Sequence, residues 1–315
     1  MDVIYSIVPL AIGNIAPLLI IAMGGLFSER SGVVNIGLEG LLGIGAFACA
    51  LVTYYLFPII GVPGVWVGIL AGALAGGVFS LLHAFACVNM QSNQVVSGTA
   101  INILAAAITV YIARILTGSA NVQIVRGIGK TNVPFLSKIP FIGDLFFKNA
   151  YTTTYIVIAI VFISWFFLYR RPGGLRLRAC GENPQAADSM GISVLKMRYI
   201  GVVMSGIYAG LGGALIIVTI SGEFSPGTFN GTGFLALAAL IFGKWQPWKV
   251  VGAASFFGLA KTVSSISRIY PAISDMPNII FNAFPYVATI IALILFSKNT
   301  VGPRAAGEPY DVSKR

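Results

Sequence analysis

Charged residues are scarce in this sequence. They make up 10% of its 315 residues, whereas hydrophobic residues make up 57%, and the mean hydropathy is +0.88. A soluble globular chain has about 25% charged residues. The composition excludes an ordinary soluble domain and predicts an all-α polytopic membrane protein, with residues 1–315 forming a single transmembrane domain.

Side chains suited to catalysis or metal binding are also few. The only histidine is His83, and Cys49, Cys87 and Cys180 fall in two apolar segments and one loop. No HExxH or GxSxG sequence is present, and GKT at 129–131 lacks the glycine that a phosphate-binding loop needs at position 124. The sequence therefore predicts no catalytic residue, no metal site and no disulfide, and an intramembrane enzyme is disfavoured.

Acidic residues number 10 against 20 lysines and arginines, which gives a net charge of +10. The basic residues concentrate in loops on one side of the predicted spans, with no basic and aromatic surface, so nucleic acid is not an expected partner. The longest basic loop, residues 170–198, should lie in the cytoplasm. We therefore expect the N-terminus outside the cell and the C-terminus inside.

Long apolar runs predict about nine transmembrane helices. The expected spans are residues 4–27, 35–57, 64–88, 95–116, 151–168, 196–220, 231–242, 250–267 and 279–296. Residues 117–150 then form an external loop and residues 297–315 a cytoplasmic tail, while 231–242 is short for a full span. Glycines in the third span (Gly68, Gly72 and Gly76), and a second group in the sixth, predict close helix packing.

A short helix is predicted inside the basic loop. Asn183 can cap its start, Pro184 suits its first position, and Gly191 suits the residue after its end. The residues that would form its small apolar face are Ala186, Ala187 and Met190. From the loop alone, a docking element for a cytoplasmic partner and an ordinary ordered loop fit this pattern equally well.

Few polar side chains lie within the apolar runs. Those that could line a solute path are Asn35, Glu39, Asn93, Asn102 and Glu223. Asn35 could cap the second span, with Glu39 one turn further along the same face. Such groups suit a neutral polyhydroxyl solute, but each residue alone fits helix packing equally well. Lys261 is expected in the outer half of its span, reaching toward the external interface.

Two stretches of the chain resemble each other. SERSGVVNIGLEGLLGIGA (28–46) follows the first span, and SGEFSPGTFNGTGFLALAA (221–239) follows the sixth. Each has a glutamate, then glycines with an asparagine, then a helix of small residues. On the expected topology they lie on opposite membrane faces. This is the pattern of an inverted repeat in a transporter, where interrupted helices lie near the pathway.

Three strings carry a family resemblance that covers nearly the whole chain. They are ERSGVVNIGLEG (29–40), RACGENPQAADSMGI (178–192) and FNGTGFLALAALIFGKWQPW (229–248). The chain resembles permease subunits of bacterial ABC importers, in the nucleoside and simple-sugar group of the branched-chain amino acid and ribose permease superfamily. It lacks the GGIDLSVG-like stretch of ribose-type permeases, which favours nucleosides as the solute.

The resemblance implies a type II importer in the bacterial plasma membrane. Its coupling to ATP hydrolysis would involve Asn183, Pro184, Ala186, Ala187, Asp188, Met190 and Gly191. The implied partners are a second, different permease, separate cytoplasmic subunits that use ATP and Mg²⁺, and an external substrate-binding lipoprotein. The chain itself would bind no cofactor.

Three other classes of transport protein remain as alternatives. A simple-sugar (ribose-like) ABC importer permease would share the architecture and differ in solute. An ion-coupled secondary transporter needs carboxylates within its spans, where only Glu39 and Glu223 are candidates, both near span ends. A passive channel would need no capped cytoplasmic helix.

Overall fold

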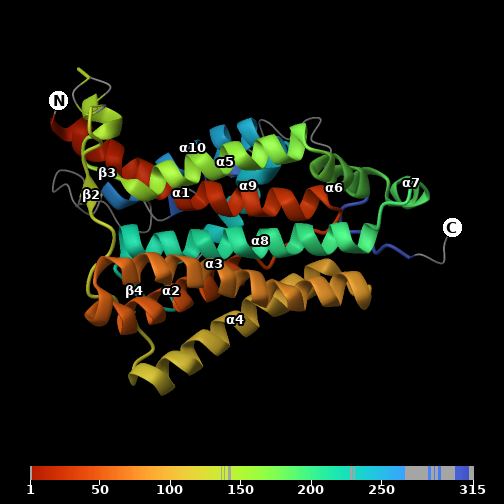
Figure 1. Cartoon of the computed structure of the whole chain (residues 1–315), viewed down its shortest axis with the longest axis horizontal. Helices are drawn as coiled ribbons and strands as arrows, with labels where there is room; N and C mark the ends of the chain where they lie inside the picture. Colours follow the sequence, from red (N-terminus) through yellow and green to blue (C-terminus); the bar gives the residue numbers. More distant parts are fainter. Residues whose placement is uncertain are drawn as a thin grey trace.

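The computed structural model describes residues 2–135, 137, 139–140, 143–227, 229, 231–266, 283–284, 287, 290–291 and 302–311. Helices dominate this part of the chain (Figure 1). The α-helices are α1 (Asp2–Arg30), α2 (Leu38–Ile60), α3 (Val62–Ala84), α4 (Gln94–Thr117), α5 (Thr152–Arg170), α6 (Pro172–Glu182), α7 (Pro184–Ser189), α8 (Val194–Ile216), α9 (Thr232–Phe242) and α10 (Pro247–Ile266).

Shorter elements extend or connect these helices. The π-helical turns are η1 (Phe85–Asn89), η3 (Gly143–Phe147) and η4 (Ile217–Ser221). The strands β1 (Val122–Gln123) and β4 (Glu223–Phe224) pair antiparallel, as do β2 (Lys130–Thr131) and β3 (Ala150–Tyr151). In Figure 1 the strands lie at the left end of the bundle and α6 and α7 at the right end. We call these the β end and the α7 end.

Six helices in the described residues are long and apolar enough to cross a membrane, and they coincide with the first six predicted spans. The seventh predicted span corresponds to α9. Its 11 residues cover about 16 Å at 1.5 Å per residue, which is roughly half of a bilayer core of about 30 Å. The eighth coincides with α10. The ninth lies almost entirely outside the described residues, so a total of nine stays a prediction.

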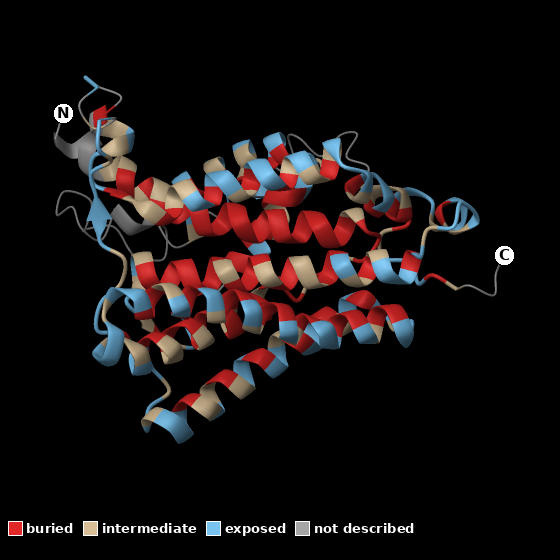
Figure 2. Cartoon of the chain, in the orientation of Figure 1, coloured by how far each residue is buried: buried red, intermediate tan, exposed pale blue. Residues whose placement is uncertain are grey.

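Helices α1 and α8 form the centre of the bundle. α8 packs against α1, α2 and α3, and α1 also packs against α9 and α10. In Figure 2 these two helices are mostly buried, whereas α4 and α5 carry exposed residues along one side. The outward side chains are large and apolar, as at Leu74, Ile103 and Ile163, which are 62–68% exposed. Such a surface suits lipid or another membrane helix.

The close approach of α2, α3 and α8 depends on glycine. A Cβ at Gly76 would lie 2.8 Å from the Gly210 Cα, and a Cβ at Gly72 would lie 2.5 Å from the Gly45 carbonyl oxygen. The predicted glycine contacts of the third and sixth spans are therefore confirmed, since backbones this close leave no room for a side chain.

Gly45→Ala is expected to destabilise the protein, whereas Gly43→Ala in the same helix is not. A Cβ at position 45 would overlap the Gly210 backbone of α8, whereas one at position 43 meets nothing within 4 Å. Overpacking of this kind costs about 1–3 kcal/mol, which lowers a melting temperature by roughly 5 °C. Thermal unfolding of the purified protein in detergent measures the difference. Equal melting temperatures for the two variants would contradict this packing of α2 on α8.

Candidate functional site

Helix α9 begins inside the protein and is capped from another helix. Its N-cap residue, Gly231, has φ +82° and no side chain to accept a hydrogen bond. The Glu39 carboxylate, in the first turn of α2, accepts from the Gly231 N–H at 2.8 Å and from the Gly233 N–H at 2.5 Å. Glu39 thus satisfies donors that a helix start leaves unpaired, and the positive end of the α9 dipole stabilises its charge.

Lys261 of α10 belongs to the same network. Its Nζ donates to the Thr232 Oγ1 at 2.9 Å, and its charge interacts favourably with Glu39. The expectation that Lys261 reaches toward the external interface is therefore wrong, because a carboxylate inside the bundle stabilises the ammonium there. The network ties α2, α9 and α10 together.

The residues before α2, 31–37, form an irregular segment held by α4. The Asn102 Oδ1 accepts from the Gly40 N–H at 2.7 Å, and the Asn102 Nδ2 donates to the Ile36 carbonyl at 3.1 Å. Asn102 is eight residues beyond the first residue of α4, or about 12 Å at 1.5 Å per residue. Irregular backbone this far inside an apolar bundle is tolerated where it is buried in protein or lines a cavity.

Asn35 holds the same segment from the side of α8. Its Nδ2 donates to the Ser205 Oγ at 2.8 Å, and its Oδ1 accepts from the Gly37 N–H at 3.0 Å. Helix α2 begins at Leu38 with Gly37 as its N-cap residue. The prediction that Asn35 caps this helix is therefore wrong. Both Asn35 and Glu39 lie inside the bundle, as predicted, but they face different neighbours.

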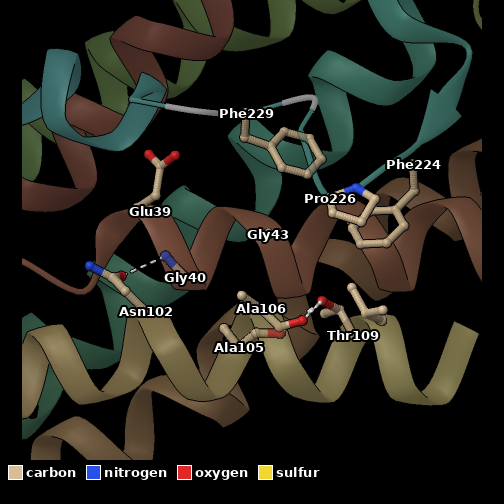
Figure 3. Close-up of a pocket in the computed structure, with 11 residues that line it drawn as sticks. Glu39, Gly40, Gly43, Asn102, Ala105, Ala106, Thr109, Phe224, Pro226 and Phe229 are labelled. Carbon is tan, nitrogen blue, oxygen red and sulfur yellow. Dashed lines mark hydrogen bonds between the residues drawn. The ribbon is translucent and has the colours of Figure 1, made fainter. Parts of the chain in front are cut away.

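A cavity of about 120 Å³ lies between α2, α4 and the side chains of Phe224, Pro226 and Phe229. Figure 3 shows residues of α4 on one side of α2, and Phe224, Pro226 and Phe229 on the other. The two phenylalanine rings have centroids 5.9 Å apart, and Glu39 and Asn102 also line the cavity. Rings, a carboxylate and an amide around one small space suit a neutral molecule with a flat apolar face and hydroxyl groups.

Of the five predicted path residues, only Glu39 and Asn102 line this cavity. Asn93 is exposed and caps α4, accepting from the N–H groups of Val95 at 2.9 Å and Val96 at 3.2 Å. Glu223 lies in β4, paired with Gln123 at the β end. Phe224 and Phe229 were not predicted to line a path, because no periodic pattern around them indicates the direction of their side chains.

The short helix predicted in the basic loop is α7. The Asn183 Oδ1 accepts from the Ala186 N–H at 3.0 Å, and Pro184 is the first helical residue. Gly191 follows the helix with φ +78°, and the backbone bonds there form a Schellman motif. The predicted caps are confirmed. α6, which precedes α7 and starts at Pro172, was not predicted.

The side chains of α7 do not share the single apolar face that was expected. Ala187 is 4% exposed and packs inward with Cys180 and Val194. Met190 is 82% exposed, and Ala186 is exposed as well. Successive helical residues are about 100° apart, so Ala186 and Ala187 face different ways. The exposed apolar tip of α7 is therefore formed by Met190 and Ala186.

The three strings that carry the family resemblance meet in the folded chain. Arg30 donates to the Trp245 carbonyl from Nε at 3.0 Å and from Nη2 at 2.8 Å, and its Nη1 lies 3.2 Å from a carboxylate oxygen of Glu182. The Trp245 Nε1 donates to Glu29 at 2.5 Å. With the Glu39 cap on α9, these contacts link segments that are far apart in the sequence.

Comparison with known proteins finds a family and several relatives. The family described as "Branched-chain amino acid transport system / permease component" matches residues 10–294. The chain is 46% identical over 315 residues to the guanosine ABC transporter permease protein NupQ of Bacillus subtilis, covering 100% of this chain and 99% of that one. It is 42% identical to the nucleoside ABC transporter permease protein NupC of Lactococcus lactis, covering 95% and 94%.

A second permease of Bacillus subtilis is a more distant relative. It is the guanosine ABC transporter permease protein NupP, 27% identical over 257 residues, covering 78% of this chain and 70% of that one. No significant match to a solved structure is found.

Proposed function

The chain belongs to the branched-chain amino acid transport system permease family, and we propose that it is a transmembrane subunit of an ATP-driven importer that moves nucleosides into the cell. It is a transport subunit and not an enzyme. The observation that carries the nucleoside assignment is whole-chain identity of 46% and 42% to permeases named for guanosine and nucleosides. The cavity supports it, because aromatic rings suit a base and polar groups suit a ribose.

One chain forms part of the pathway. Its cavity of about 120 Å³ is smaller than the roughly 300–1,000 Å³ of typical ligand pockets. A second, different permease therefore completes the pathway in a type II importer. The existence in one organism of two permeases named for guanosine, both similar to this chain, supports such a pair.

Helix α7 docks the cytoplasmic subunits that bind and hydrolyse ATP with Mg²⁺. The contact centres on the exposed tip at Met190 and Ala186, with Asn183, Pro184, Asp188 and Gly191 setting the shape of the loop. Arg170, Arg171 and Arg176 at the α7 end support a cytoplasmic location for it. The N-terminus is then outside in the bacterial plasma membrane, and an external substrate-binding lipoprotein delivers the solute to the β end.

A competition assay tests the solute class. Uptake of a labelled nucleoside by the complete complex is expected to fall when unlabelled nucleosides are added, and to stay unchanged with ribose or leucine. Competition by ribose or leucine but not by nucleosides would overturn the nucleoside assignment while leaving an importer in place. Reconstituted vesicles provide a second measurement, since solute with its binding protein should stimulate ATP hydrolysis.

A further inference from the structure

The last described segment of the chain, residues 302–311, folds back onto the α7 end. We call it the tail strap. The Ala305 N–H donates to the Gly181 carbonyl of α6 at 2.9 Å, and the Gln91 Nε2 donates to the Tyr310 carbonyl at 3.4 Å. Ala305 and Tyr310 are 5% and 6% exposed. The strap is therefore packed against the bundle and is not a free polar tail.

Arg198 of α8 anchors the strap near its end. This side chain is 1% exposed. Its Nη1 donates to the Glu308 carbonyl at 2.9 Å, and its guanidinium carbon lies 5.9 Å from the centroid of the Tyr310 ring. A buried guanidinium bound to backbone and facing an aromatic ring fixes the strap to a central helix.

Tyr310 is the strap residue that shares an apolar cluster with α7. It forms one apolar cluster with Cys180, Ala187 and Val194, so its ring is part of the packed group that buries the inward face of α7. Beside this cluster, a cavity of about 280 Å³ is lined by Asn183–Gln185 and by strap residues. The start of α7 and the strap are therefore not continuously packed, and the Tyr310 ring joins the strap to the apolar cluster that includes Ala187.

Helix α7 needs such support because it is short. Its six residues are far below the roughly 12–15 at which an isolated helix becomes marginally stable, so packing must hold it. Its other packed neighbours among the described helices are α6 and α8. Without the Tyr310 ring, the cluster around Ala187 loses its largest side chain.

We propose that the tail strap, through Tyr310, is a positioning element that holds α7 at the height and angle at which it transmits ATP hydrolysis to the transport path. The proposal rests on the proposed coupling role of α7. Arg198 positions Tyr310, and neither residue touches the solute. Loosening the strap is expected to disturb coupling between ATP hydrolysis and uptake without blocking the pathway.

The reactivity of the Cys180 thiol measures whether the strap is packed in place. It is buried, and burial raises the pKa of its thiol to about 11, so at pH 7 roughly one molecule in ten thousand carries the reactive thiolate. In the purified protein, Tyr310→Ala should increase maleimide labelling about tenfold or more, because exposure restores an ordinary thiol. Tyr310→Phe keeps the ring, and Arg304→Ala changes an exposed strap residue, so both should label like the original protein. Cys180→Ser in the Tyr310→Ala background should remove the added label.

Coupling is measured on the reconstituted complex with its ATPase subunits. In Tyr310→Ala, ATP hydrolysis should continue, while solute transported per ATP should fall about fivefold or more; Tyr310→Phe should retain coupling. Deleting residues 302–315 should reproduce both the labelling and the coupling effects. Unchanged labelling, or unchanged transport per ATP, in Tyr310→Ala would overturn the proposal. If the original complex shows no nucleoside-stimulated hydrolysis, the proposed function fails instead, and the labelling experiment still tests the contact.

Discussion

Replacing Met190 with glutamate is expected to reduce nucleoside uptake roughly tenfold or more while the protein stays folded and inserted. Met190 is 82% exposed, so the substitution disturbs little within the chain. In the assembled importer the same position should be dry, because the proposed docking packs this apolar tip into the ATPase subunit. A carboxylate buried there without a partner costs several kcal/mol, enough to release the contact.

The matched control is Met190→Leu, which keeps an apolar tip of similar volume and should retain uptake. Copurification of the ATPase subunits with the permease measures docking, and uptake by the complete complex measures its consequence. Ala186→Arg, also at an exposed position, should behave like Met190→Glu. Ala187→Arg is a poor test of docking, since Ala187 is buried in an apolar cluster with Cys180 and Tyr310. Normal uptake and normal copurification in Met190→Glu would exclude this tip as the docking element.

Replacing Glu39 with leucine is expected to abolish uptake by releasing the start of α9. The Gly231 and Gly233 N–H groups would lose their acceptors, at about 1–3 kcal/mol for each buried donor. The Lys261 ammonium would also lose a favourable interaction with the Glu39 charge. Because the cavity wall at Phe229 leads directly into α9, the pathway should lose its shape together with the cap.

A series of single and double variants separates the effect of the lost hydrogen-bond acceptors from the effect of the lost charge. Glu39→Gln removes the charge and keeps one acceptor oxygen, so it should destabilise less than Glu39→Leu. Adding Lys261→Met to Glu39→Gln should restore part of the melting temperature, because it removes the charge that lost its counterpart. Thermal unfolding measures the stability of each variant, and uptake by the same preparations measures its activity. A Glu39→Leu protein as stable and as active as the original would disprove the capping role.

Local patterns in the sequence predicted the elements that local interactions form. Six long apolar runs became membrane-length helices, because burial of a helix in lipid depends mainly on its own composition. Asn183, Pro184 and Gly191 correctly marked the ends of α7, because a cap is made within a few residues of the helix. The glycines of the third and sixth spans predicted close packing, since a missing Cβ is visible without knowing the neighbour.

The sequence did not predict which distant groups would meet. Lys261 interacts with the charge of Glu39, more than two hundred positions away. In the segment expected to be a polar tail, Tyr310 instead packs in one cluster with Ala187 of α7. Ala187 faces inward into a cluster that includes Tyr310, a partner that the sequence of the loop does not indicate.

Composition, hydrophobic runs and motifs by themselves therefore determined that this chain is a helical membrane protein, where its first six spans lie, and how α7 begins and ends. Only the tertiary structure decided that Glu39 caps α9, that Phe224 and Phe229 face one cavity with Asn102, and that Tyr310 of the tail joins the apolar cluster of Ala187. The physical reason is that helix formation and membrane burial depend on neighbours within a few residues. A buried charged side chain, or an unpaired N–H group at a helix start, instead pairs with the group that the packing of the bundle places beside it.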